Sequence, residues 1–289
     1  MEVLCKNINE LGEGPTWDPK KKVLYWIDIT KSKIFQYNPA DKSTKSWNTD
    51  SHIGSLALKE SGGLVLALKD GFYDFDLDSG KQTCISIADN DPNRRFNDGK
   101  CDPSGRFWAG TMHYDEAAPL GSLYCLDSTG EAKCAFDSVF CSNGLAWSVD
   151  KTQFYYIDSQ LHRVDVFDYD DQNGRLSNRR VAIELKEAKG FPDGCTIDAE
   201  GMLWVAFWEG GRIDRYNPKN AELIETLVIP GVEKVTSCTF GGENLDDLYI
   251  TTASIGYSPE ELKEQENAGS LLRIKINHTK GLLTNYYRA

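Results

Sequence analysis

The sequence predicts an all-β protein with a single domain over residues 1–289, a six-bladed β-propeller with a metal site at one mouth of its central channel. The first observation is a repeat, because a turn followed by an apolar triplet recurs with triplets that begin at residues 24, 64, 107, 154, 203 and 248. A spacing of about 40–50 residues between units of short strands is the period of a propeller blade. The second observation is that six such units fill the 289 residues, which leaves no room for another domain.

The clearest repeat covers residues 190–205. Pro192 and Gly194 predict a turn that holds Asp193 between them. A short apolar strand, a hairpin turn and a second apolar strand follow. A carboxylate is therefore expected on a tight turn directly before a buried strand.

The six blades are expected in chain order. The segment 3–8 is expected to pair with the last blade, because ring closure removes the open sheet edges that would otherwise pair with other molecules. Strands of the first blade are predicted at 15–17, 23–29, 33–37 and 44–47. The blades are predicted to begin near residues 13, 51, 95, 143, 193 and 236.

Two segments allow different interpretations. The acidic stretch 258–267 could form a short helix or a solvated loop, and we favour the loop. The stretch 168–174 resembles the start of a calcium-binding loop, but its glycine falls one place late and position twelve is Arg179 instead of glutamate. We interpret it as a hairpin turn.

Composition excludes several classes of function. The formal net charge of −12 argues against a nucleic-acid partner, whose phosphates require a basic surface. No run of about 18 apolar residues predicts a membrane span, and the N-terminal residues do not resemble a signal peptide. The eight cysteines lack the CxxC spacing, which favours reduced thiols in a cytoplasmic protein. We take a monomer as the default state.

Polar residues recur at the start of the innermost strand of each predicted blade. Innermost strands run side by side along the channel, so equivalent positions surround one mouth of it. These positions hold Glu13, Ser55, Asn97 and Asp98, Asn143, Asp193 and Ser237. Two carboxylates, Glu13 and Asp193, and two amides, Asn97 and Asn143, are therefore expected to converge from four blades.

Carboxylates packed together at low dielectric are costly unless a cation or protons compensate their charge. Oxygen ligands suit one divalent cation, with Ca²⁺ preferred and Mg²⁺, Mn²⁺ or Zn²⁺ as alternatives. The preferred ligands are Glu13, Asn143 and Asp193. Asn143 alone could also serve turn geometry, and we interpret Asp98 as a structural turn residue. Arg95 could grip a substrate oxygen or form a surface ion pair.

Seven segments together resemble the SMP-30/gluconolactonase/luciferin-regenerating-enzyme family, a regucalcin-like family. They are Gly12-Glu13-Gly14-Pro15-Thr16-Trp17, Arg95-Phe96-Asn97-Asp98-Gly99-Lys100, Ala109-Gly110-Thr111-Met112, Ser142-Asn143-Gly144-Leu145-Ala146-Trp147-Ser148, Phe154-Tyr155-Tyr156-Ile157-Asp158-Ser159, Pro192-Asp193-Gly194 and Gly210-Gly211-Arg212. The resemblance covers essentially the whole chain.

The resemblance implies a six-bladed propeller with one catalytic cation at the channel mouth. Its metal ligands fall on Glu13, Asn143 and Asp193, and its substrate contacts fall on Arg95 and Asn97. It places a third substrate contact at Asp115, where vertebrate members carry a glutamate. The loop before Gly121 is shorter than in those members and looks more like that of the insect luciferin-regenerating branch.

The favoured function is metal-dependent hydrolysis of a small lactone, which makes the protein a hydrolase acting on cyclic esters. Asp193 would act as the catalytic base that activates water. One alternative is a luciferin-regenerating or organophosphate hydrolase that uses the same site. Another is a non-catalytic calcium-binding regulatory protein.

Overall fold

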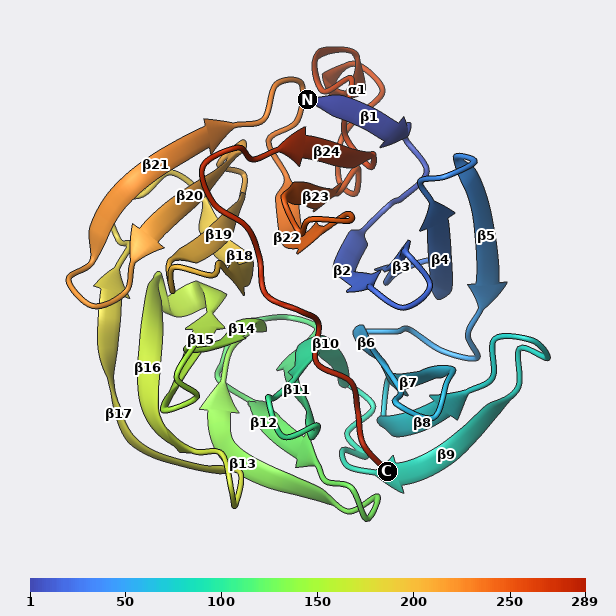
Figure 1. Ribbon diagram of the computed structural model, residues 1–289, viewed down its shortest axis with the longest axis vertical. Coiled ribbons are helices and arrows are strands. Elements are labelled where there is room, and N and C mark those ends of the chain that lie inside the picture. Colours follow the sequence, from blue (N-terminus) through green and yellow to red (C-terminus); the bar gives the residue numbers. More distant parts are fainter.

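The computed structural model describes all residues, 1–289, and has six four-stranded antiparallel sheets arranged as a ring around a central channel (Figure 1). This arrangement confirms the predicted six-bladed propeller. In each blade the strands run outward from the channel in sheet order, and the innermost strands are β2, β6, β10, β14, β18 and β22.

The strands of the six blades follow one another along the chain. Blades one and two comprise β2 (Gly12–Asp18), β3 (Val23–Asp28), β4 (Lys33–Asn38), β5 (Ser43–Asn48), β6 (Ser55–Leu58), β7 (Leu64–Ala67), β8 (Gly71–Phe75) and β9 (Gln82–Ile87). Blades three and four comprise β10 (Arg94–Cys101), β11 (Phe107–His113), β12 (Gly121–Leu126), β13 (Ala132–Val139), β14 (Ser142–Trp147), β15 (Gln153–Asp158), β16 (Arg163–Asp170) and β17 (Arg175–Glu184). Blades five and six comprise β18 (Phe191–Ile197), β19 (Leu203–Trp208), β20 (Arg212–Asn217), β21 (Glu222–Val228), β22 (Val235–Gly241), β23 (Asp247–Thr252), β24 (Leu271–Lys275) and β1 (Glu2–Cys5).

The N-terminal strand closes the ring, as predicted. β1 pairs with β24 in antiparallel register, with Glu2 opposite Arg273 and Val3 opposite Leu272. The last blade therefore combines the first strand of the chain with its last three strands (Figure 1). This pairing covers an edge of β24 that would otherwise be open to association.

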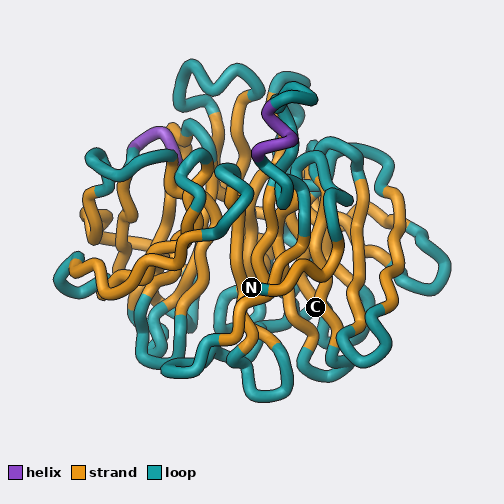
Figure 2. Tube along the Cα trace, turned by 90° about the horizontal axis from the view of Figure 1, so that it is seen from above, coloured by secondary structure: helices purple, strands orange, loops and turns teal.

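Two short helical segments lie at the same end of the ring (Figure 2). The 3₁₀-helix η1 covers Ser159–Leu161, and the α-helix α1 covers only Glu261–Glu264. The acidic stretch 258–267 therefore contains one helical turn within a loop, so the preferred loop interpretation holds for most of it. No helix of the structure has the length and apolar character needed to cross a membrane.

The repeated triplets are buried strand centres, and turn aspartates stabilise two of them. Trp108 Nε1 donates a hydrogen bond to Asp102 Oδ2 at 2.9 Å, and Trp204 Nε1 donates to Asp198 Oδ2 at the same distance. Both aspartates are fully buried, so each indole N–H is satisfied inside the core. The turn and the triplet of these repeats are thus joined through space as well as along the chain.

The inner strands carry register irregularities near the polar residues that the sequence analysis singled out. In five of the six blades the pairing of the inner strand shifts, between Glu13 and Thr16, Phe96 and Gly99, Asn143 and Leu145, Pro192 and Cys195, and Val235 and Ser237. A bulge re-aims the side chains beside it. The irregularities therefore explain how residues of regular strands can face the channel mouth.

Glycines at two of these irregularities permit close approach between neighbouring blades. A Cβ atom on Gly194 would lie 2.1 Å from Ser237 Oγ, and one on Gly144 would lie 2.8 Å from the backbone oxygen of Asp193. Neither contact is possible for a larger residue without movement of the inner strands. The Asn143-Gly144 and Asp193-Gly194 pairs therefore combine a polar side chain with a tight blade-to-blade contact.

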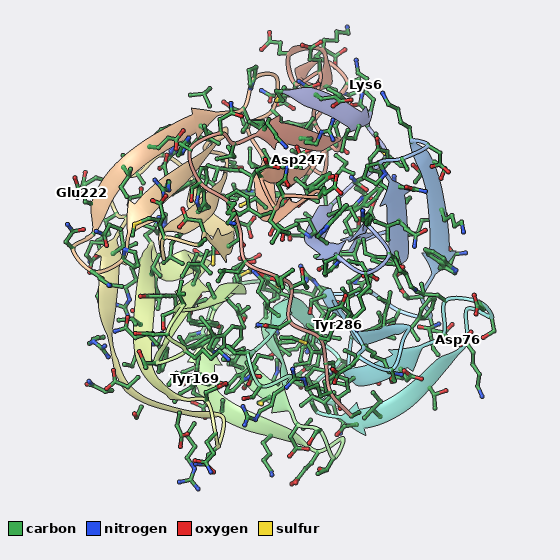
Figure 3. All side chains as sticks on the ribbon, viewed as in Figure 1. Lys6, Asp76, Tyr169, Glu222, Asp247 and Tyr286 are labelled. Carbon is green, nitrogen blue, oxygen red and sulfur yellow. The ribbon has the colours of Figure 1, made fainter.

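A C-terminal strap, residues 280–288, crosses the ring from blade five to blade three (Figure 1). Its backbone bonds to Ala199 in blade five and to Leu58 in blade two, and the Tyr287 hydroxyl donates to the Asp127 oxygen at 2.8 Å. Figure 3 shows Tyr286 of the strap over the inner part of the ring, whereas Glu222 of β21 lies at the outer rim. The strap therefore ties several blades together.

We expect Tyr287→Ala to lower the free energy of unfolding by about 3–5 kcal/mol, because the ring of Tyr287 is fully buried and its removal leaves a cavity. Urea unfolding followed by circular dichroism measures this. The matched control is Leu283→Ala in the same strap, because the Leu283 side chain is 68% exposed. This substitution should change the free energy of unfolding by less than about 0.5 kcal/mol. Equal effects of the two substitutions would refute the tying role of Tyr287.

Candidate functional site

A cavity of about 190 Å³ opens at one mouth of the channel. Its walls combine acidic, amide and apolar side chains. They are Leu11, Glu13, Ile29, Arg95, Asn97, Met112, Glu116, Cys141, Asn143, Ser159, Gln160, Phe191, Asp193 and Trp208. The structure thus brings together Glu13, Arg95, Asn97, Asn143 and Asp193, five of the six residues predicted for the site.

Three buried carboxylates lie near one another at this end of the channel. Glu13, Asp98 and Asp193 are each 6–7% exposed. Each receives a hydrogen bond from the backbone amide of the glycine that follows it, and no Lys or Arg side chain hydrogen-bonds to any of them. Three carboxyl groups are therefore buried without a hydrogen bond from a basic side chain.

The electrostatic consequence is visible in the pKa values of these groups. Burial, followed by the charge of Asp98, raises the pKa of Glu13 to about 8. Burial, followed by the charges of Glu13 and Asp98, raises the pKa of Asp193 well above its usual range. Burial also raises the pKa of Asp98. A positive ion between these groups would reverse the effect, because it favours their ionised forms.

The structure contradicts the interpretation of Asp98 as a turn residue. It lies within β10, and it borders a second cavity of about 280 Å³ that fills the channel between the mouth and the strap. Lys100 borders the same cavity, and its Nζ donates to the backbone oxygen of Cys195 at 2.6 Å. Asp98 therefore forms part of the channel beneath the mouth cavity and adds to its negative potential.

The predicted ligands provide a suitable donor set for a hard divalent cation. Two buried carboxylates, Glu13 and Asp193, and the amide of Asn143 face one cavity from three blades. No three His, Cys, Asp or Glu side chains form a group that could hold a metal ion by themselves. Oxygen donors of this kind are those that Ca²⁺ and Mg²⁺ prefer.

A hydrogen-bonded row joins Arg95 to Asn143. Arg95 Nη1 donates to Asn97 Oδ1 at 2.6 Å, and Asn97 Nδ2 donates to Asn143 Oδ1 at 3.0 Å. Arg95 Nη1 also donates to the Phe96 oxygen at 3.0 Å, so Nε and Nη2 of Arg95 remain without a protein acceptor. These two groups can therefore donate to a ligand in the cavity, and Arg95 is not part of a surface ion pair.

The structure corrects the prediction for Asp115. Its side chain is 79% exposed, lies 3.8 Å from His113 Nδ1 and does not line the cavity. The neighbouring Glu116 lines the cavity instead and accepts a hydrogen bond from Gln160 Nε2 at 3.0 Å. Glu116 adopts a left-handed backbone with φ of 49°, unusual for a residue other than glycine, and this turn directs its side chain rather than that of Asp115 inward.

Sequence reasoning missed several residues of the cavity besides Glu116. Ser159 and Gln160 belong to η1, and the apolar wall includes Met112, Cys141 and Trp208. Ser159 is the last residue of a segment that resembles the family, so the resemblance could have indicated it as a site residue. Met112 likewise ends such a segment and lies in β11, Trp208 is the last residue of β19, and Gln160 and Cys141 lie between strands.

We expect Glu13→Gln to stabilise the protein in a chelator, by about 1–3 kcal/mol at pH 8, because the substitution removes a buried charge that no cation then compensates. Since the folded-state pKa of Glu13 is raised from 4.5 to about 8, the destabilisation grows as pH rises through this window. The gain should therefore vanish as pH falls toward 4.5. Urea unfolding at several pH values measures it.

The control is Glu116→Gln, because Glu116 lines the same cavity but is only half-buried. We expect this substitution to change the free energy of unfolding by less than about 0.5 kcal/mol. A loss of stability in chelated Glu13→Gln at pH 8 would mean that the carboxylate is compensated by the protein itself.

Comparisons with known proteins agree with the resemblance seen in the sequence. Residues 11–254 match a family model described as SMP-30/Gluconolactonase/LRE-like region. The chain is 41% identical to regucalcin of Danio rerio over 284 residues, 98% of this chain and 96% of that protein. Among solved structures, a luciferin-regenerating enzyme matches with a TM-score of 0.91 and 33% identity over 100% of both chains. A calcium-binding protein, regucalcin, from Agrobacterium tumefaciens matches with a TM-score of 0.95 and 27% identity over 99% of this chain and 97% of that one.

Proposed function

The chain belongs to the SMP-30/gluconolactonase/LRE-like family, and from this membership we propose that it is a hydrolase that opens small lactone rings with the aid of one divalent cation. The observation that carries the proposal is the mouth cavity itself. Buried carboxyl groups that accept no hydrogen bond from a basic side chain face the same space as an arginine with unused donors. Such a site combines a place for a cation with a place for a polar substrate.

Glu13, Asn143 and Asp193 would hold the cation, with Ca²⁺ preferred and Zn²⁺, Mn²⁺ or Mg²⁺ as alternatives. When bound, the cation would polarise the lactone carbonyl and offset the negative charge that develops on its oxygen. It would also compensate the carboxylates, whose burial is otherwise unfavourable.

The residues of the chain have separate roles in the proposed reaction. Asp193 accepts a proton from the attacking water, whose oxygen forms a bond to the carbonyl carbon. The bond between that carbon and the ring oxygen then breaks, and the ring oxygen takes the proton. The product is an open hydroxy acid, so one water is consumed and no oxidant or reductant is needed.

Arg95 and Asn97 would orient the substrate through polar groups on its ring. The free Nε and Nη2 of Arg95 supply donors, and the bond from Arg95 Nη1 to Asn97 holds the guanidinium in place. The apolar wall formed by Met112, Phe191 and Trp208 would contact the carbon skeleton. We add Glu116 to the substrate-binding residues in place of Asp115.

We expect Glu116→Ala to raise KM for lactones at least about tenfold with a smaller change in kcat, because a hydrogen bond between a charged group and a substrate hydroxyl contributes about 1.5–3 kcal/mol. Steady-state kinetics with a polyhydroxylated lactone measures this. Asp115→Ala is the matched control, and its KM should stay within twofold of the parent value. The reverse pattern would restore Asp115 as the substrate contact.

Two other functions have support from the comparisons. Similarity to a luciferin-regenerating enzyme over the whole chain favours a luciferin-regenerating activity in the same cavity. An organophosphate hydrolase that uses this cavity is a further alternative from the sequence analysis. The printed description of the Agrobacterium tumefaciens protein as calcium-binding favours a non-catalytic calcium-binding regulatory role. Arg95 with its unused donors argues for catalysis.

A substrate panel at one fixed cation concentration separates these functions. Sugar lactones, aliphatic lactones, a linear ester and an organophosphate are assayed by proton release. We expect hydrolysis of lactones and little hydrolysis of the linear ester. Turnover of the organophosphate alone would select the second hydrolase, and calorimetric Ca²⁺ binding without any turnover would select the regulatory role.

We further propose that the protein is a cytoplasmic monomer. The cytoplasmic location is supported by its eight cysteines, all of which are free thiols in the structure, and the monomer is the default state. Analytical ultracentrifugation at micromolar concentration should report one species of 32.4 kDa. A stable dimer would contradict the monomer.

A further inference from the structure

We infer that Ser159 is a positioning residue that determines which atom of the Asn143 amide faces the proposed cation. The inference rests on the proposed cation site. It concerns a residue without a step of its own in the proposed reaction, whose hydroxyl bonds to one proposed ligand and to the residue that precedes another.

The donor and acceptor roles of the Ser159 hydroxyl are determined by its two neighbours. Ser159 lies at the start of η1 and is buried, and its Oγ lies 2.6 Å from the backbone oxygen of Pro192. A carbonyl oxygen can only accept, so Ser159 must donate its single hydroxyl hydrogen to Pro192. Only lone pairs remain on Oγ for its other neighbour.

That other neighbour is the amide of Asn143. Asn143 Nδ2 donates to Ser159 Oγ at 2.8 Å, and because Oγ presents lone pairs, the amide must turn its nitrogen toward Ser159. Its oxygen is then directed the opposite way, where Asn143 Oδ1 accepts from Asn97 Nδ2 at 3.0 Å. The amide is therefore held from both ends and cannot rotate by half a turn without losing two hydrogen bonds.

This orientation matters because only one end of an amide can bind a cation. The oxygen carries lone pairs, whereas the NH₂ group presents positive hydrogens that would repel the cation. Pro192 directly precedes Asp193, so the row Pro192–Ser159–Asn143 couples the proposed ligands of blades four and five. Removing a group that orients a metal ligand costs about 10–100-fold in metal affinity in proteins generally.

A double-mutant cycle with Asn143→Asp tests the inference, because both terminal atoms of an aspartate are oxygens and its orientation has no consequence. The dissociation constant for Ca²⁺ is measured by calorimetry on chelator-treated protein for the parent, S159A, N143D and the double variant S159A/N143D. We expect S159A to weaken binding at least about tenfold in the parent background. In the N143D background the same change should alter binding by less than about threefold.

Two further variants serve as controls. S138A removes an exposed serine hydroxyl that bonds to Asp137, away from the cavity, and should leave Ca²⁺ affinity unchanged. S159T retains the hydroxyl and should bind within about threefold of the parent. Should S159A fail to fold, S159C takes its place in the cycle, because a thiol is a weak acceptor and donor.

The outcomes separate this inference from the proposed function. If the parent protein binds none of Ca²⁺, Zn²⁺, Mn²⁺ and Mg²⁺, the cation site itself is wrong and the role of Ser159 falls with it. If the parent binds and S159A binds equally well, or if S159A loses the same factor in both backgrounds, the inference alone is overturned.

Discussion

Replacing Asp193 by alanine is expected to lower kcat for lactone hydrolysis by about 10³-fold or more. The substitution removes both a proposed cation ligand and the group that takes the proton from water, and a positioned base alone contributes about 10²–10⁴-fold. Because Asp193 is buried beside Glu13 and Asp98, its loss also relieves repulsion between carboxylates. The variant should therefore be inactive while remaining folded.

The measurement is steady-state turnover of the best lactone of the panel, together with cation content and thermal unfolding. Asp115→Ala, the same change at an exposed position on the loop beside the cavity, should keep at least half of the parent activity. An Asp193→Ala protein that retains full activity and bound cation would overturn the role of Asp193 as cation ligand and base. Loss of folding would be recognised by circular dichroism.

Removing the cation with a chelator should have the second large effect, reducing turnover to below about 1% of its starting value. Without the cation the carbonyl is not polarised, and the buried carboxylates repel one another. Restoring Ca²⁺, Zn²⁺, Mn²⁺ or Mg²⁺ separately identifies which ion supports activity. A cation present at 100 times its dissociation constant should also stabilise the fold by about 2.7 kcal/mol.

The control for chelation is the Glu13→Gln protein, which lacks one proposed ligand. Its thermal midpoint should rise much less than that of the parent when the cation is added. Full activity in a chelated protein whose cation content has been shown to be negligible would contradict metal dependence. A cation-dependent rise in stability without any turnover would favour the calcium-binding alternative.

The repeat explains why so much of the fold could be predicted from the sequence. Each blade is built from local strands joined by turns, so the periodic triplets such as Leu203-Trp204-Val205 predict both the strands and their order. Pairing of β1 with the last blade followed from the need to close the ring. The equivalence of blades then predicted that Glu13, Asn143 and Asp193 would share one mouth, and all three line one cavity.

The differences lie where a positive φ, an irregularity in a strand or a contact between blades decides the geometry. The choice between Asp115 and Glu116 depends on one residue with a positive φ, which no local pattern marks when that residue is a glutamate. Asp-Gly pairs favour turns, so the sequence predicts a turn at Asp98, yet the irregularity in β10 buries this residue beside the channel. The role of Ser159 depends on hydrogen bonds to residues 16 and 33 positions away.

The most direct test of the proposed cation site is an anomalous diffraction map of crystals soaked in Mn²⁺, recorded near the manganese absorption edge. We predict one strong peak at the channel mouth, coordinated by oxygens of Glu13, Asn143 and Asp193. A map without a peak at the mouth, or with a peak that these three oxygens do not contact, would contradict the proposal.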